Sequence, residues 1–136
     1  MAKLVATLGK TPGGIAETLR SLTSGRFEAP FDPQPISISE LLVIRTRETD
    51  ESYYFLQAIL TCCLDFDKLE EVILPFDDVS SPQDFVTVRE ATRKALRPGD
   101  FFDFSGGRKA ISSAAVLAAR EVGAHLVSSV IDQEEY

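Results

Sequence analysis

Short apolar segments alternate with longer amphipathic segments along the chain, and this alternation predicts the secondary structure. The apolar segments have the length of buried strands and cover residues 3–8, 41–44, 69–74, 101–102 and 124–131. Between them, apolar residues recur every three or four positions, which is the spacing of one helix face. This spacing predicts helices at residues 15–23, 51–63, 82–95 and 110–120, followed after the last strand by a polar tail at 132–136.

Two of these helices have a predicted inward face. In the second helix we expect the buried stripe to consist of Phe55, Ala58, Ile59 and Cys62. In the third helix we expect it to consist of Phe85, Val88, Ala91 and Ala95. Cys62 and its neighbour Cys63 are accordingly expected to be core thiols.

Strands that alternate with helices are joined by right-handed crossovers and form a parallel sheet. We therefore predict an α/β fold with a mainly parallel sheet. With 136 residues, the chain is expected to be a single domain, 1–136. In sheets of this kind, ligands bind at the carboxyl ends of the strands.

Two glycine-containing turns are predicted at that edge. The first, residues 9–14, follows the first strand and contains Lys10 and Thr11. The second, residues 105–108, precedes the fourth helix and ends with Arg108, next to Lys109. Backbone N–H groups at a helix start favour an anion, usually a phosphate. Arg108 and Lys109 place two positive charges at the positive end of the helix dipole, which costs stability. We infer that these charges serve to bind a ligand.

Neither turn has the spacing of a familiar nucleotide motif. A P-loop requires glycine five positions before its Gly-Lys pair, where this chain has Leu4, and Pro12 removes an N–H group. The dinucleotide pattern G-x-G-x-x-G is also absent. The first turn, taken alone, is equally consistent with a Pro-Gly-Gly connection that has no ligand.

Charge and composition narrow the class of ligand. Fourteen Lys and Arg against twenty-one Asp and Glu give a net charge of −7, which disfavours binding to long nucleic acids but allows a local pocket for a small polyanion. We expect no leader, since the first residues lead directly into a strand-like segment. No apolar run has the length of a membrane span, and the two adjacent cysteines give no disulfide framework. We expect a soluble, intracellular protein without a membrane partner.

Other side chains have weaker claims to a role. His125, the single histidine, is expected at the opposite edge of the sheet. Asp78, with its neighbour Asp77, could bind a ribose hydroxyl or begin a turn, and we favour the turn. Tyr53 or Tyr54 could stack on a base. No set of His, Cys and carboxylate residues has metal-site spacing, so neither a metal nor another cofactor is predicted.

The segments Lys3–Gly14 and Asp103–Ala110, taken together, resemble the CARF domains of CRISPR-associated proteins. More narrowly, the chain is similar to the stand-alone ring nucleases of type III CRISPR systems. The resemblance implies a Rossmann-like three-layer fold and a cytoplasmic homodimer. It also implies binding and metal-independent cleavage of cyclic tetra-adenylate, which switches off the antiviral signal.

The resemblance assigns roles to residues of both turns. Thr11 occupies the position of a family serine, and Arg108 and Lys109 match the family's Arg-Lys pair. These three are the predicted catalytic residues. The remaining turn residues are the predicted substrate-binding set: Gly9, Lys10, Pro12, Gly13, Gly14, Ser105, Gly106 and Gly107. In this scheme a ribose 2′-hydroxyl attacks the adjacent phosphate.

Two alternatives remain open. A non-catalytic CARF sensor would bind the same ring and pass the signal to a partner, although a sensor ordinarily carries a fused effector. A nucleotide-binding oxidoreductase belongs to another class, and the missing dinucleotide motif counts against it.

Overall fold

The computed structural model describes residues 1–129 and has a parallel β-sheet between two layers of helices. Its elements in chain order are β1 (Ala2–Thr7), α1 (Gly13–Ser24), β2 (Ile38–Arg45), the 3-10 helix η1 (Arg47–Thr49), α2 (Asp50–Cys63), β3 (Leu69–Ile73), α3 (Pro82–Ala95), β4 (Phe101–Asp103), α4 (Lys109–Val122) and β5 (His125–Val127). The five strands are ordered β3-β2-β1-β4-β5, and every pair is parallel. The predicted Rossmann-like α/β fold is confirmed.

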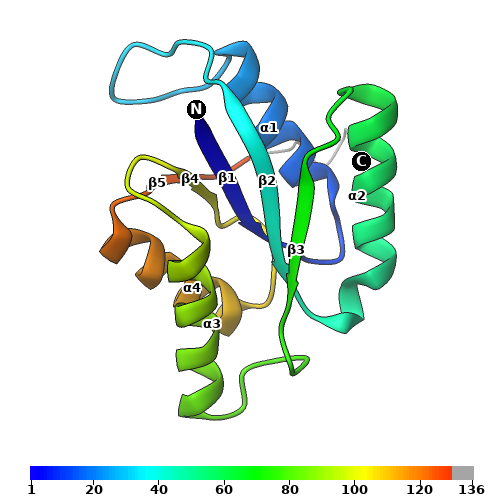
Figure 1. Ribbon diagram of the computed structural model, residues 1–136, viewed down its shortest axis with the longest axis vertical. Coiled ribbons are helices and arrows are strands. Elements are labelled where there is room, and N and C mark those ends of the chain that lie inside the picture. The colour runs from blue at the N-terminus through cyan, green and yellow to red at the C-terminus, as the bar shows by residue number, and fades with distance from the viewer. Residues whose placement is uncertain (130–136) are drawn as a thin grey trace.

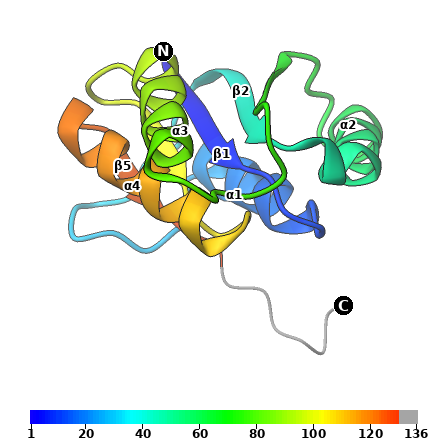
Figure 2. The same ribbon diagram turned by 90° about the horizontal axis from the view of Figure 1, so that it is seen from below.

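Strand β1 lies at the centre of the sheet, and its side chains alternate between two cores. Leu4 and Ala6 pack with residues of α1 and α2, whereas Val5 packs with residues of α3 and α4. Figures 1 and 2 show the two helix pairs on opposite faces of the sheet. This alternation follows from the two-residue period of a strand, and it accounts for the continuous apolar sequence of β1.

The order of the strands determines where a ligand can bind. From β1 the chain builds outward through β2 and β3 to one edge, and then returns to place β4 and β5 on the other side of β1. The crevice at such a reversal lies beyond the carboxyl ends of the central strands, here β1 and β4. Both glycine turns begin at these two ends.

The predicted inward face of α2 is wrong except at Ile59, which is partly buried against the core. Phe55 is 57% exposed, and Ala58, Cys62 and Cys63 are exposed as well. The buried residues are Ser52, Tyr53, Leu56 and Leu60. The hydroxyl groups of Ser52 and Tyr53 suggest a polar face in a hydropathy pattern. These residues are nevertheless buried, Ser52 against the Gly9 carbonyl that follows β1 and Tyr53 against Arg45 at the end of β2. The helix is therefore rotated relative to the prediction.

The predicted face of α3 agrees with the structure. Val88 and Ala95 are buried, and Phe85 and Ala91 are partly buried in the same core. Strand β5 ends at Val127, so it is shorter than the predicted 124–131, whose last two positions lie outside the described residues together with the 132–136 tail. Within residues 1–129, no helix is long and apolar enough to cross a membrane.

Candidate functional site

The two glycine turns touch each other through their backbones. A Cβ atom built on Gly9 would lie 2.9 Å from the amide nitrogen of Gly107. One built on Gly106 would lie 2.8 Å from the carbonyl oxygen of Thr7, and Gly107 has a φ of +88°. The Thr7 hydroxyl also donates a 2.7 Å hydrogen bond to the Gly106 carbonyl. Glycine is required here because real Cβ atoms do not tolerate such distances and L side chains rarely adopt that φ.

The second turn is anchored by the last residue of β4. Asp103 is fully buried, and its Oδ1 accepts a 2.8 Å hydrogen bond from the Ser105 amide and a second bond from the Ser105 hydroxyl. The Ser105 hydroxyl in turn accepts from the Ser129 amide at 3.0 Å. Ser105, a predicted substrate-binding residue, therefore already has protein partners. Its hydrogen bonds to Asp103 and Ser129 stabilise the turn.

The first turn leads into α1, whose amino end has no side-chain cap among residues 1–129. Pro12 is the N-cap residue, and Gly13 and Gly14 begin the helix. Helix N–H groups are consequently left for a ligand or solvent at this point. Thr11 is exposed just before it.

A cavity of about 230 Å³ lies between the turns and the end of β2. Gly9, Lys10, Gly107 and Arg108 line it from the two turns, and Glu48 lines it from η1. Four predicted site residues are therefore brought together around one space. The lining of this cavity does not include Thr11 or Lys109, both of which are exposed. The proposed catalytic trio is thus divided, with Arg108 alone on the cavity.

Carboxylates surround the Arg108 guanidinium. Its Nη2 atom lies 2.8 Å from Glu48 Oε2, and its Nη1 atom lies 3.7 Å from Asp78 Oδ2. The hydrogen bond to Glu48, then the charges of Glu48 and Asp78, raise the pKa of Arg108 above its ordinary value. Asp78 also accepts from the Val79 amide at 2.8 Å, as expected of a turn residue. Lys109 has no ion-pair partner among residues 1–129.

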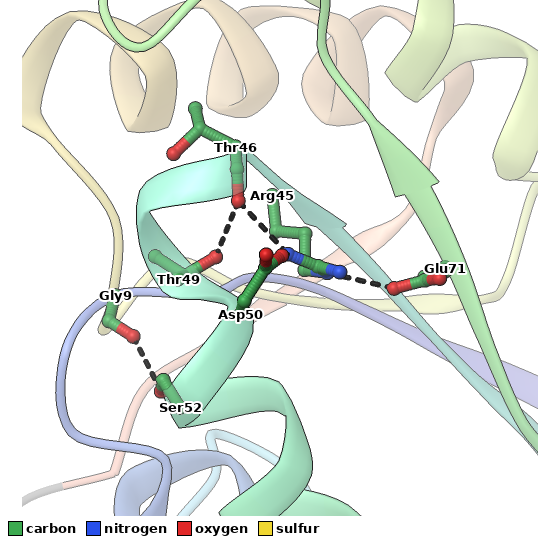
Figure 3. A network of polar contacts seen from close by, with 7 residues as sticks. All are labelled: Gly9, Arg45, Thr46, Thr49, Asp50, Ser52 and Glu71. Atoms are coloured by element: carbon green, nitrogen blue, oxygen red, sulfur yellow. Dashed lines mark hydrogen bonds and ion pairs between the residues drawn. The ribbon is translucent and has the colours of Figure 1, made fainter.

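The sequence interpretation missed the importance of Arg45. This residue ends β2, is 5% exposed, and pairs with Asp50 at 2.6 Å and Glu71 at 2.7 Å. Its guanidinium also lies 4.8 Å from the centre of the Tyr53 ring. Figure 3 shows this network joining β2, β3 and the start of α2. A charged residue directly after the apolar run 41–44 was the available signal.

The network raises the pKa of two of its members, Arg45 and Tyr53. Burial alone would lower the pKa of Arg45, but the hydrogen bonds and charges of Asp50 and Glu71 outweigh it and raise that pKa. Burial, followed by the charge of Glu71, raises the pKa of Tyr53 as well. Arg45 remains charged at any physiological pH, so its ion pairs connect the end of β2 to α2 and β3 over that whole range.

The remaining candidates lie away from the cavity lining or are buried. His125 pairs in register with Phe101 at the amino end of β4, the edge opposite the turns. Tyr53 is buried and is unavailable for stacking on a base, whereas Tyr54 is 67% exposed. Within residues 1–129, no group of three or more His, Cys, Asp or Glu side chains could hold a metal ion.

Comparison with known proteins provides the family. No protein-family model matches the sequence. The chain is 36% identical over 142 aligned positions to a CRISPR system ring nuclease of Saccharolobus solfataricus, and the alignment covers the whole chain and 75% of that protein. Because the alignment spans the whole chain, the similarity is not confined to a single motif. The chain therefore belongs to the CRISPR ring nuclease family.

Proposed function

We propose that this protein degrades cyclic oligoadenylate, and specifically cyclic tetra-adenylate, and so switches off a type III CRISPR antiviral signal. The observation that carries the proposal is the backbone contact between Gly9 and Gly107. It puts Lys10, Arg108 and the uncapped amino end of α1 at one edge of the sheet. Cations and free backbone N–H groups at one edge of the sheet would bind an anionic ligand with several phosphates.

The proposed reaction is an internal transfer at phosphorus that needs no metal ion. A ribose 2′-oxygen forms a bond to the adjacent 3′-phosphorus, and the bond from phosphorus to the next 5′-oxygen breaks. The 2′-hydroxyl proton is lost to water, and the departing 5′-oxygen gains one. The products are linear, with a 2′,3′-cyclic phosphate at one end and a 5′-hydroxyl at the other. Alignment and fixed positive charge supply the catalysis.

Three residues have distinct roles in this scheme. Lys109, exposed at the first position of α4, neutralises the charge that develops on the phosphate. Arg108 binds a phosphate oxygen pair through its planar guanidinium. Thr11 orients the attacking hydroxyl or a phosphate oxygen. The glycine turns contribute backbone donors, and Lys10 adds a further cation on the cavity.

A two-fold homodimer matches the symmetry of the ring. A cyclic tetramer of one nucleotide has a two-fold axis, and an isologous dimer has the same symmetry. One chain with a net charge of −7 offers few cations, whereas pairing doubles Lys10, Arg108 and Lys109 around four phosphates. We propose that residues 1–136 act as one CARF-like domain in such a dimer, in the cytoplasm. Calorimetry should then give one ring for two chains, and one ring for each monomeric chain would refute the dimer.

Incubation of cyclic tetra-adenylate with the protein in EDTA, followed by chromatography, tests the activity. Linear products formed at the same rate with and without the chelator support the nuclease. An intact ring that co-elutes with the protein would instead support the sensor, which binds without cutting. A ring that neither changes nor co-elutes would contradict both.

A further inference from the structure

The first glycine turn is held in place by a side chain from α2. The Ser52 hydroxyl donates a 2.7 Å hydrogen bond to the carbonyl oxygen of Gly9, and Ser52 is 5% exposed (Figure 3). Among residues 1–129, no other hydrogen bond involves residues 9–11. In the part of the chain that the structure describes, this bond is therefore the single hydrogen-bonded tether of the segment that carries Lys10 and Thr11.

This hydrogen bond differs from those of the helical threonine hydroxyl groups, and it spans far more sequence than that of Ser112, which donates to Phe104 eight positions earlier. Thr23, Thr87 and Thr92 donate to the carbonyl four residues earlier in their own helix. Ser52 instead reaches a turn that is 43 positions away in sequence. A hydroxyl that only needed a partner could have bonded locally, so this contact couples two separate elements.

The position of Ser52 is itself fixed by the end of β2. Asp50, two residues earlier in α2, accepts a 2.6 Å hydrogen bond from Arg45. The Thr49 amide and hydroxyl donate to the Thr46 carbonyl at 3.2 Å and 2.8 Å. The same carbonyl accepts from Arg45 at 3.0 Å. Glu71 in turn holds Arg45 from β3. The polar contacts thus fix Thr49 and Asp50, and the backbone of α2 connects these residues to Ser52 and its bond to the first turn.

The turn is bounded on its other side by the second turn. A Cβ atom on Gly9 would lie 2.9 Å from Gly107 N, so Gly9 has no room to move toward α4. Ser52 opposes movement away from it. Together these contacts hold Gly9 against Gly107, and they thereby constrain the separation between Thr11 and Lys109, each of which lies two residues further along the chain. Errors of about 1 Å in such a separation can change a rate by ~10²-fold.

We infer that Ser52 is a positioning residue, which fixes the turn that carries Lys10 and Thr11, with Arg45 fixing the helix end that carries Ser52. The inference rests on the proposed function for its kinetic consequence. Its structural part, the tether, is independent of the ligand. Supporting shells of this kind are what keep a site's reacting groups within the tolerance that catalysis needs.

Three variants test the tether: Ser52→Ala, which lacks the hydroxyl, Ser52→Thr, which retains it, and Thr92→Val as a control. Thr92 is fully buried and its hydroxyl bonds to the Val88 carbonyl at 2.9 Å, so the control loses a buried hydrogen bond in α3. The measurements are NMR order parameters of the Lys10 and Thr11 amides, the single-turnover cleavage rate and the dissociation constant of cyclic tetra-adenylate.

We expect Ser52→Ala to lower the order parameters of Lys10 and Thr11 and to slow single-turnover cleavage by about tenfold. Ring affinity should change by less than about threefold, since other groups bind the phosphates. Ser52→Thr should restore both the order parameters and the rate, and Thr92→Val should alter neither. Unchanged order parameters in Ser52→Ala would overturn the tether, and an unchanged rate would overturn its kinetic role. If the parent protein left the ring intact, the proposed function would fail, and the order parameters alone would decide the inference.

Discussion

The guanidinium of Arg108 lies 2.8 Å from the carboxylate of Glu48, and both side chains line the cavity between the glycine turns. A phosphate that binds Arg108 must therefore displace this carboxylate or share the guanidinium with it. Both side chains are partly exposed, at 50% and 38%, so the ion pair contributes little stability. A phosphate could therefore replace the Glu48 carboxylate at little cost. If Arg108 binds a phosphate as we propose, Glu48 competes with that phosphate for the guanidinium.

Replacing Glu48 by glutamine should strengthen ring binding. The substitution removes the competing charge and its repulsion of the phosphates, while the amide still fills the space. Because exposed ion pairs contribute little, we expect the dissociation constant to fall by roughly two- to fivefold. Titration calorimetry at low salt measures this directly.

A matched variant separates the local effect from a change in net charge. Glu90 lies on α3 near Lys3, toward the amino end of β1, and Glu90→Gln removes the same charge there. It should leave the ring affinity unchanged. Equal effects of the two substitutions, or weaker binding by Glu48→Gln, would show that Glu48 does not compete for Arg108.

Removing the Lys109 ammonium should abolish most cleavage. Lys109 is exposed at the first position of α4, and no ion pair holds it within residues 1–129. Loss of a group that stabilises transition-state charge typically lowers a rate by ~10²–10³-fold. Single-turnover rates of Lys109→Ala and of Lys94→Ala, an exposed lysine on α3, provide the comparison. Near-parental cleavage by Lys109→Ala would remove Lys109 from the chemistry.

The contact between the turns should make an alanine substitution at Gly9 more destabilising than one at Gly13. A Cβ atom on Gly9 would meet the Gly107 backbone at 2.9 Å, whereas one on Gly13 has no neighbour within 4 Å. Gly9→Ala should therefore lower the free energy of unfolding by about 1–3 kcal/mol, as overpacking does. Gly13→Ala, in the first turn of α1, should be neutral or stabilise by up to about 1 kcal/mol. Urea unfolding followed by circular dichroism measures both, and equal stabilities would contradict the contact.

The sequence predicts the fold well because each element has a clear period. The continuous apolar run of β1 and the three- to four-residue spacing in α3 leave little ambiguity about strand or helix. The face of α2 was missed because Ser52 and Tyr53 are buried against polar partners, namely the Gly9 carbonyl and Arg45. A hydropathy pattern treats these residues as solvent-facing, and the partners are known only once the strands are placed.

The candidate site was predictable in its location but not in its internal contacts. Placing both glycine turns at the carboxyl edge follows from the alternation of strands and helices. The touching of Gly9 and Gly107 follows from β1 and β4 being neighbours in the sheet. That adjacency is a property of strand order, which no local pattern contains. The pairing of Arg108 with Glu48, 60 positions away, depends on the same order.

Two substitutions at Thr11 separate a chemical role from a packing role. Thr11→Ser keeps the hydroxyl and loses a methyl group, whereas Thr11→Val keeps the shape and loses the hydroxyl. Because Thr11 is exposed, packing contributes little, and Ser should retain or improve the rate. Val should lose about tenfold or more, since misplaced reacting groups are costly. The test is the cleavage rate at saturating enzyme. A Thr11→Val variant as fast as the parent would show that the Thr11 hydroxyl has no role in the reaction.

We propose that the ring is opened by its own 2′-hydroxyl, which is positioned between the two glycine turns. Identification of the product ends, by mass spectrometry and ³¹P NMR after a single turnover in EDTA, tests this claim most directly. We expect linear products that all carry a 2′,3′-cyclic phosphate and a 5′-hydroxyl. Products with a 5′-phosphate and a free 3′-hydroxyl, or cleavage that stops in EDTA, would contradict it, because water or a metal-bound hydroxide would then be the nucleophile.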